Sequence, residues 1–87
     1  MDVLTHDDKI ILETIRQHCW AGNTTITMSE WLSVLSSRSP QYVSELLNKH
    51  HDDGNIVILL NNRYKLTLKG AYRLGGILLW LRRLLSA

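Results

Sequence analysis

The sequence predicts a small, mainly α-helical domain that carries one β-hairpin. Three observations lead to this fold class. Three stretches before Gly54 have apolar residues at helical spacing, two short stretches after it have strand-like residues, and helical spacing returns toward the C-terminus. A chain of 87 residues has room for a single core of limited size. The expected order is therefore three helices, a two-stranded hairpin and a C-terminal helix.

The first helix is predicted for residues 6 to 19. Thr5 and Asp8 have the spacing at which two side chains cap a helix start, and the acidic Asp7 and Asp8 suit the positive end of the helix dipole. The apolar stripe of this helix consists of Ile11, Leu12, Ile15 and Cys19.

A second, short helix is predicted for residues 28 to 35. Thr27 and Glu30 have the pattern of a capping box, in which each side chain accepts a hydrogen bond from the other residue's backbone amide. The stretch "SSRSP" then interrupts the helical spacing. The residues expected to face the core are Trp31, Leu32 and Leu35.

The third helix is predicted for residues 40 to 53. Ser39 supplies an N-cap hydroxyl, and Pro40 occupies the first helical position, where its missing N–H is not needed. Gly54 is expected to end the helix in a left-handed conformation. The core-facing stripe consists of Val43, Leu46, Leu47 and His50.

The hairpin is predicted from residues 56 to 60 and 63 to 68, both rich in residues that favour strands. Asn61 and Asn62 separate the two strands, and asparagine tolerates the positive φ angles of a tight hairpin turn. Residues 71 to 87 then return to helical spacing.

Charge is distributed unevenly along the chain. The first 54 residues contain eight acidic and four basic side chains, a net charge of −4, whereas the remainder has six basic side chains and no acidic one. A polyanion would be attracted to the second segment. Scattered Lys and Arg side chains are also common on solvated surfaces that bind nothing. Charge alone therefore does not decide between a polyanion-binding surface and an ordinary solvated one. The six cations are Arg63, Lys65, Lys69, Arg73, Arg82 and Arg83.

Two stretches carry a resemblance to a known family. "ITMSEWLSVLSSRSPQYVSELLNKHHDDGNI" and "RYKLTLKG" resemble the winged helix-turn-helix of bacterial and archaeal transcription regulators of the MarR and PadR types. The resemblance covers residues 26 to 70 most tightly. Three departures stand out: Trp31-Leu32 where a smaller pair is usual, His50 where leucine is usual, and Asn55 where an apolar residue is usual.

The resemblance implies binding of double-stranded DNA, with the helix at residues 40 to 53 in the major groove and the hairpin on the backbone or minor groove. The alternative hypothesis is a winged-helix module that binds a protein and not DNA. The expected DNA-binding residues are Arg38, Ser39, Gln41, Tyr42, Ser44, Asn48, Lys49, Asn61, Asn62, Arg63 and Lys65.

The C-terminal helix is expected to be a dimerisation element that follows a DNA-binding domain at residues 1 to 70. Its apolar side is broader than one small domain needs, so we expect it to pack partly against a second copy in a two-fold homodimer. Two alternatives are that it only covers the monomer core, or that it binds another protein or an anionic membrane surface. The interface residues are Leu74, Ile77, Leu78, Trp80, Leu81, Leu84 and Leu85.

Enzymatic and cofactor-dependent functions are not indicated by any motif. The sequence lacks a Gly-rich phosphate loop, a nucleophile elbow and a His-Glu-x-x-His pattern. His18 and Cys19 diverge on a helix and do not form a nucleophile pair. The single cysteine and the absence of a signal-peptide pattern predict a cytoplasmic protein, and no stretch is apolar for long enough to span a membrane.

The stretch "NKHHDDGN" at residues 48 to 55 is rich in potential metal ligands. Consecutive residues on a helix fan out instead of converging, so we expect no metal site there. His50 is expected to face the core, where protonation would place a charge, and acid should then destabilise the fold.

Overall fold

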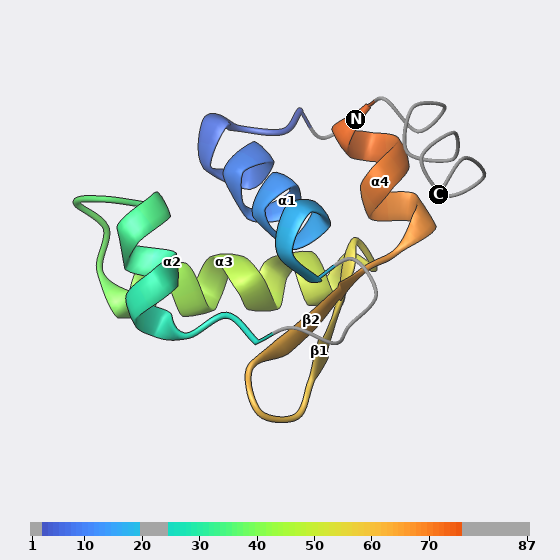
Figure 1. Cartoon of the computed structure of the whole chain (residues 1–87). Helices are drawn as coiled ribbons and strands as arrows, with labels where there is room; N and C mark the ends of the chain where they lie inside the picture. Colours follow the sequence, from blue (N-terminus) through green and yellow to red (C-terminus); the bar gives the residue numbers. More distant parts are fainter. Residues whose placement is uncertain (1–2, 20–24, 76–87) are drawn as a thin grey trace.

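The structure, a computed structural model, describes residues 3–19 and 25–75. Within these ranges it contains four α-helices and one two-stranded antiparallel hairpin (Figure 1). This arrangement confirms the predicted mainly helical fold with one small hairpin. The elements are α1 (His6–Cys19), α2 (Met28–Val34), α3 (Pro40–Asp52), β1 (Ile56–Leu59), β2 (Arg63–Leu66) and α4 (Leu68–Leu74).

The predicted caps are present at the starts of the first three helices. At α1, the Thr5 amide donates to Asp8 Oδ2 at 2.9 Å and the Asp8 amide donates to Thr5 Oγ1 at 3.1 Å. At α2, Thr27 and Glu30 form the complete capping box, and at α3 the Ser39 hydroxyl accepts from the backbone of the first turn. Local side-chain chemistry therefore defines where each helix begins.

Two helices end one residue earlier than predicted. Leu35 is the C-cap of α2, with φ −110° and ψ 62°, and so lies outside helical geometry. Asp53 is the C-cap of α3, and Gly54 follows it with φ 79°, the left-handed conformation expected of this glycine.

The first strand is one residue shorter than predicted, because Leu60 belongs to the turn. Ile56 pairs with Leu66 at the base of the hairpin, and Leu59 pairs with Arg63 at its tip. Asn61 and Asn62 have φ angles of 62° and 58°, as expected for these residues in a turn.

The segment that precedes α2 adds a short third pairing to the hairpin. Thr25 forms an antiparallel bridge with Arg63, and the Ile26 amide donates to the carbonyl of Asn62 at 2.9 Å. This pairing joins the α2 start to the tip of β2, a contact that the sequence pattern did not indicate.

The second strand was predicted too long, because residues 67 and 68 belong to α4. Thr67 is the N-cap of this helix, and its hydroxyl accepts from the Gly70 amide at 3.0 Å. α4 runs to Leu74 and therefore crosses the expected division between residues 70 and 71. Residues 76–87 of the predicted C-terminal helix lie outside the described residues.

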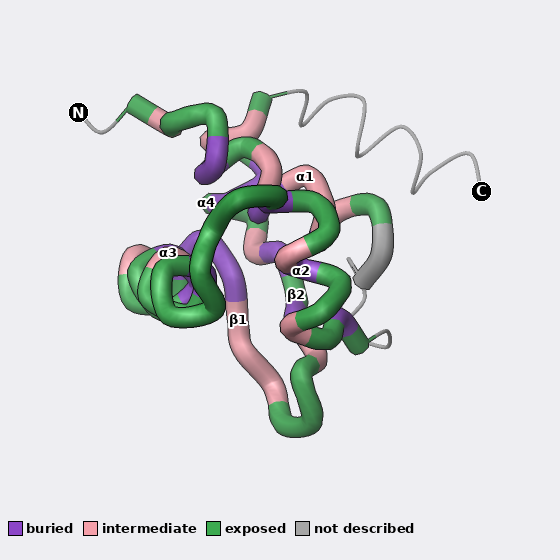
Figure 2. The backbone as a smooth tube through the Cα atoms, turned by 90° about the vertical axis from the view of Figure 1, so that its left-hand side faces the viewer, coloured by how far each residue is buried: buried purple, intermediate pink, exposed green. Residues whose placement is uncertain are grey.

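The core lies between α1 and the other elements (Figure 2). α1 packs against β2 and α4, whereas α3 packs against α2 and β1. Figure 2 shows that one side of α3 and the base of the hairpin are buried, while the hairpin tip is exposed. Trp31 and Tyr64 meet edge to face, with ring centroids 5.6 Å apart, so the bulky Trp31 fills the space between α2 and β2. The most buried apolar side chains are Ile11, Leu12, Ile15, Trp31 and Val43.

Gly70 allows α4 to approach the start of the hairpin closely. A Cβ atom at this position would lie 2.1 Å from the carbonyl oxygen of Asn55. The same carbonyl oxygen accepts from the Thr67 amide at 3.1 Å and from the Thr67 hydroxyl at 2.9 Å. Thr67 and Gly70 therefore fix α4 against the base of the hairpin.

Candidate functional site

The outward face of α3 is the first part of the candidate site. Val43, Leu47 and His50 are each at most 4% exposed, so one side of α3 is fully packed. The opposite side projects into solvent. Among the described residues, the side chains of Ser44, Asn48 and Lys49 are exposed and make no hydrogen bond or ion pair. Gln41 is exposed too, and its amide nitrogen donates to Glu45 Oε1 at 3.3 Å.

The hairpin tip is the second part of the candidate site. Lys65, Asn61 and Asn62 are exposed there. Arg63 is half-buried, and its Nε donates to the carbonyl oxygen of Leu60 at 3.3 Å, which holds the side chain against the turn. The tip also exposes an apolar residue, because Leu60 is 81% exposed.

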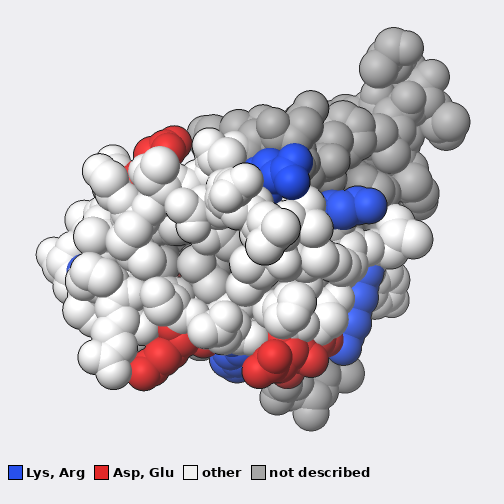
Figure 3. All heavy atoms as spheres, turned by 90° about the horizontal axis from the view of Figure 1, so that it is seen from below, with Lys and Arg blue, Asp and Glu red and all other residues white. Residues whose placement is uncertain are grey.

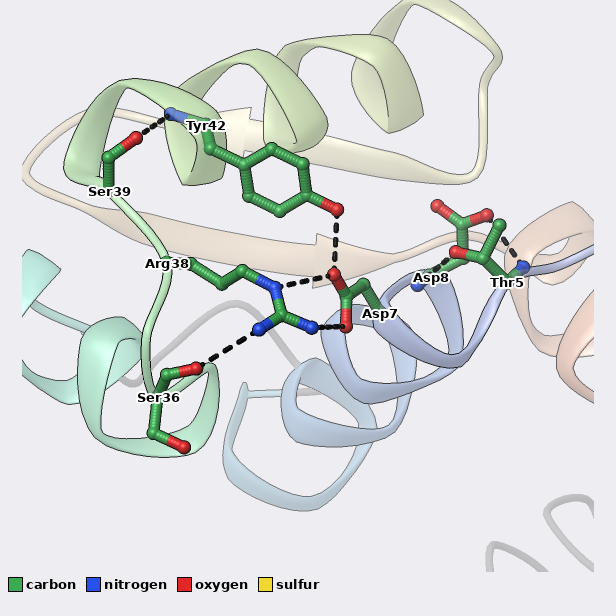
Figure 4. Close-up of polar contacts among 7 residues, drawn as sticks. All are labelled: Thr5, Asp7, Asp8, Ser36, Arg38, Ser39 and Tyr42. Carbon is green, nitrogen blue, oxygen red and sulfur yellow. Dashed lines mark hydrogen bonds and ion pairs between the residues drawn. The ribbon is translucent and has the colours of Figure 1, made fainter.

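Arg38 and Tyr42, two of the expected DNA contacts, are bonded to Asp7 of α1 (Figure 4). Arg38 Nε lies 3.0 Å from Asp7 Oδ2 and Arg38 Nη2 lies 3.1 Å from Asp7 Oδ1, so the pair is bidentate. The Tyr42 hydroxyl donates to Asp7 Oδ2 at 2.6 Å. Ser39, between them in sequence, uses its hydroxyl to cap α3. We name Asp7, Arg38 and Tyr42 the Asp7 cluster.

The hydrogen bonds of the Asp7 cluster shift the pKa values of Asp7 and Tyr42. Hydrogen bonds from the Arg38 guanidinium and then from the Tyr42 hydroxyl hold the pKa of Asp7 below its ordinary value of 3.8. The hydrogen bond to Asp7 and burial together raise the pKa of Tyr42. Asp7 is therefore ionised and Tyr42 keeps its proton at neutral pH.

The neighbouring Asp8 takes part in a buried network with His50 and Asn55. Asp8 Oδ1 lies 2.8 Å from His50 Nε2, and His50 Nδ1 lies 2.9 Å from Asn55 Nδ2. The three residues are 2%, 1% and 0% exposed. Because the Asn55 amide donates to Nδ1, His50 carries its proton on Nε2 and donates it to Asp8. The side chains of His50 and Asn55 are thus hydrogen-bonded to each other.

This network changes the interpretation of the inward-facing histidine. The expected burial of His50 is confirmed, but its side chain is not alone in the core, because a carboxylate contacts the ring. Burial by itself raises the pKa of Asp8, but the hydrogen bonds from the Thr5 backbone and from His50 outweigh it, and the pKa lies below the ordinary value. A protonated His50 would therefore have a buried counterion.

The sequence does not indicate the long-range partners of Asp7 and Asp8. It predicts that both suit the positive end of the α1 dipole and that Asp8 caps the helix with Thr5, and these local roles are a sufficient explanation for acidic residues in a first turn. Their partners lie 31 or more positions along the chain, in the turn before α3 and in α3 itself. No local spacing indicates pairs at such separations.

The structure describes only some of the residues that bear on a metal site, a membrane span and the expected dimer interface. Within residues 3–19 and 25–75, no three His, Cys, Asp or Glu side chains come together as metal ligands, and no helix is long and apolar enough to cross a membrane. Of the expected dimer residues, only Leu74 is described. It lines an open groove of about 600 Å³ together with Ile10 and Val34.

Charge on the candidate site is mixed. Figure 3, which views the molecule from the hairpin end, shows acidic side chains along the lower edge and at the upper left, Lys and Arg mostly toward the right, and a broad uncharged area in the middle. On α3 itself, Glu45 and Asp52 are exposed beside Lys49. The candidate site is therefore mainly polar and uncharged, with few cations for a polyanion.

Comparison of the chain with models of protein families, with curated proteins and with solved structures finds no match in any of the three.

Proposed function

We propose that this protein is a winged helix-turn-helix domain that binds double-stranded DNA. In this proposal α2 and α3 form the helix-turn-helix, α3 enters the major groove, and the hairpin β1–β2 is the wing that contacts the backbone or the minor groove. Three features support this assignment. They are the order of the elements, the capped start of α3 and the hairpin that comes immediately after α3.

The observation that carries the proposal is the unpartnered polar face of α3. Exposed polar side chains on a helix do not by themselves indicate a binding site. Here, however, Ser44, Asn48 and Lys49 lie on the face opposite the packed stripe, and a hairpin that carries a lysine follows the helix. Asn48 has the amide that pairs bidentately with adenine, and Gln41 has the same group once it leaves Glu45. Lys49 and Lys65 are suited to contact phosphates.

The proposed functional unit is a homodimer that acts as a transcription regulator. Phosphate contacts supply most of the non-specific affinity, and one copy offers few exposed cations on this face, so a single domain would bind weakly. Two copies related by a two-fold axis would double the contacts and would read two successive major grooves.

Binding of a protein is the second candidate function, and two observations favour it. Leu60 is 81% exposed at the hairpin tip, where an apolar side chain suits a protein surface better than a phosphate backbone. Glu45 and Asp52 on the exposed side of α3 would repel DNA.

The two functions are separated by titrating the protein into labelled duplexes drawn from a random pool, at about 50 mM and about 200 mM salt. The DNA proposal predicts binding that weakens at the higher salt. It also predicts weaker binding by the variant Arg63→Ala plus Lys65→Ala. Absence of binding to any duplex at the lower salt, or binding unaffected by this double substitution, would contradict it.

A matched pair of single substitutions tests the face of α3. Lys49→Ala and Lys9→Ala each remove one exposed lysine, which lies on α3 in the first case and on α1 in the second. We expect Lys49→Ala to weaken binding and to lower the slope of log K against log salt by about 0.9, the value for one phosphate contact. Lys9→Ala should leave both quantities close to those of the unmodified protein.

A further inference from the structure

The Asp7 cluster brings together the donors of a phosphate-binding site around a carboxylate of the same chain (Figure 4). Arg38 uses Nε and Nη2 on the two oxygens of Asp7, and the Tyr42 hydroxyl donates to one of those oxygens. The Nη1 atom of Arg38 donates to the Ser36 carbonyl oxygen at 3.2 Å, which fixes the plane of the guanidinium. The carboxylate therefore accepts three directed hydrogen bonds.

The same donors match the oxygens of a phosphodiester. A guanidinium binds the two oxygens of a carboxylate or of a phosphate in the same bidentate geometry, and a phenol hydroxyl adds a third bond. Only one of the two anions can be bound in this way at a time. While Asp7 holds the position, the positive charge of Arg38 is neutralised and contributes little attraction to a polyanion.

Exposure differs between the donors and the acceptor. The side chain of Asp7 is 10% exposed, whereas that of Arg38 is 40% exposed and Tyr42 is 39% exposed. An incoming phosphate can therefore reach the donors without unfolding α1 or α3. Arg38 and Tyr42 lie at the start of α3, which is the end of the recognition helix that approaches DNA most closely in the proposed mode.

We propose that Arg38 and Tyr42 form a phosphate subsite of the DNA interface, and that Asp7 occupies this subsite in the free protein as a competitor within the chain. The inference rests on the proposed function, because the ligand is a backbone phosphate of the bound duplex. DNA binding then includes an exchange in which the guanidinium of Arg38 releases the carboxylate and takes the phosphate. The depressed pKa of Asp7 keeps the competitor charged at neutral pH.

The substitution Asp7→Asn tests the exchange because it keeps the size of the side chain and removes the negative charge. We expect the variant to bind duplex DNA about two- to five-fold more tightly at about 50 mM salt, the range that the strength of an exposed ion pair allows. We also expect its salt slope to be steeper by about 0.9, since one more phosphate is neutralised.

A double-mutant cycle with Arg38→Ala separates exchange from general repulsion of DNA by Asp7. If Asp7 competes for Arg38, the gain from Asp7→Asn disappears when Arg38 is alanine. A gain that persists in the Arg38→Ala background, an unchanged affinity of Asp7→Asn, or a weaker affinity would each overturn the proposal.

Glu13→Gln is the matched control. Like Asp7, Glu13 lies on α1 and pairs with an arginine, Arg16, so the substitution removes the same charge and releases the same type of group. We expect it to change the affinity by less than about two-fold. If Glu13→Gln and Asp7→Asn increased the affinity for DNA equally, the change in net charge would explain the increase. This result would also overturn the proposed subsite.

These binding experiments distinguish failure of the proposed subsite from failure of the proposed DNA-binding function. Binding by the unmodified protein without a gain in Asp7→Asn contradicts only the subsite. Absence of duplex binding by the unmodified protein and by every variant contradicts both the proposed function and the subsite. Far-UV circular dichroism of each variant, compared with the unmodified protein, shows that affinity is measured on a folded chain.

Discussion

Asp7 and Asp8 are neighbours in the first turn of α1 and both are buried, yet the partners of Asp7 reach solvent and the partner of Asp8 lies in the core. Asp8 is 2% exposed and contacts His50, which is also buried. Asp7 contacts Arg38 and Tyr42, both of which reach solvent. Successive residues on a helix point about 100° apart, so one turn directs two carboxylates into two environments.

The exposure of its partners decides what each aspartate does. A buried charge that loses its partner is left without solvation, so the Asp8 network acts as a fixed connection between α1, α3 and the hairpin. The partners of Asp7 have water as an alternative, and an ion pair whose arginine is 40% exposed contributes less net stability than a fully buried one. The Asp8 network is therefore expected to hold the fold, and the Asp7 cluster is free to exchange ligands.

The strongest test of this comparison is to make the same substitution at both positions. In Asp8→Asn, one acceptor oxygen is replaced by an NH₂ group that faces a donor, either His50 or the Thr5 amide. We expect this variant to lose about 3 kcal/mol of the free energy of unfolding, measured by urea denaturation. Asp7→Asn should lose much less. Equal losses at both positions would show that the exposure of their partners does not distinguish them.

A smaller effect is expected from a change at the hairpin end of the Asp8 network. Gly70→Ala places a methyl group 2.1 Å from the carbonyl oxygen of Asn55, so the backbone must move. We expect a loss of about 2 kcal/mol, with the midpoint of urea denaturation as the measurement. An alanine in a helix without such a contact would instead stabilise it by about 1 kcal/mol, so a gain in stability would contradict this packing.

The smallest expected effect is a dependence of stability on acid. The folded protein lowers the pKa of both Asp7 and Asp8 below the ordinary 3.8, so the unfolded chain binds their protons more tightly. Their contribution to stability is present above pH 3.8 and is lost as the pH falls through the depressed values. Melting temperatures measured from pH 5 downward should fall less steeply in Asp7→Asn than in the unmodified protein. Parallel curves would show that Asp7 does not contribute.

Local chemistry explains why much of the fold was predictable from the sequence. A cap needs a particular side chain within three residues of a helix start, and Ser39 followed by Pro40 provides that signal. A turn with positive φ favours residues such as Asn61 and Asn62. These preferences are independent of the rest of the chain, so the sequence alone locates the first three helix starts and the hairpin turn.

The errors occurred where a local pattern supported two structures. Tyr64, Leu66 and Leu68 alternate as strand residues do, which extended the second strand to residue 68. In the structure Thr67 caps a helix, and Leu68 begins that helix with 63% of its surface exposed. The hydrogen bonds from Thr67 to the Asn55 carbonyl, at the start of this helix, join two elements and have no local signal.

The sequence predicts which residues lie on the exposed face of α3, but it does not predict which residues of the candidate site bond to other parts of the chain. The exposure of Ser44, Asn48 and Lys49 follows from helical periodicity. The engagement of Arg38 and Tyr42 with Asp7 does not, because it depends on how α1 packs beside the turn before α3.

The central claim is that the outward face of α3 and the hairpin tip bind duplex DNA. Mapping of ¹⁵N-labelled protein by NMR during titration with a selected duplex at about 50 mM salt tests it most directly. The claim predicts shifts of the backbone amides in residues 41–49 and 61–65, together with a shift of the Arg38 Nε–H signal as it leaves Asp7. Shifts confined to other surfaces, or none at saturating duplex, would contradict it.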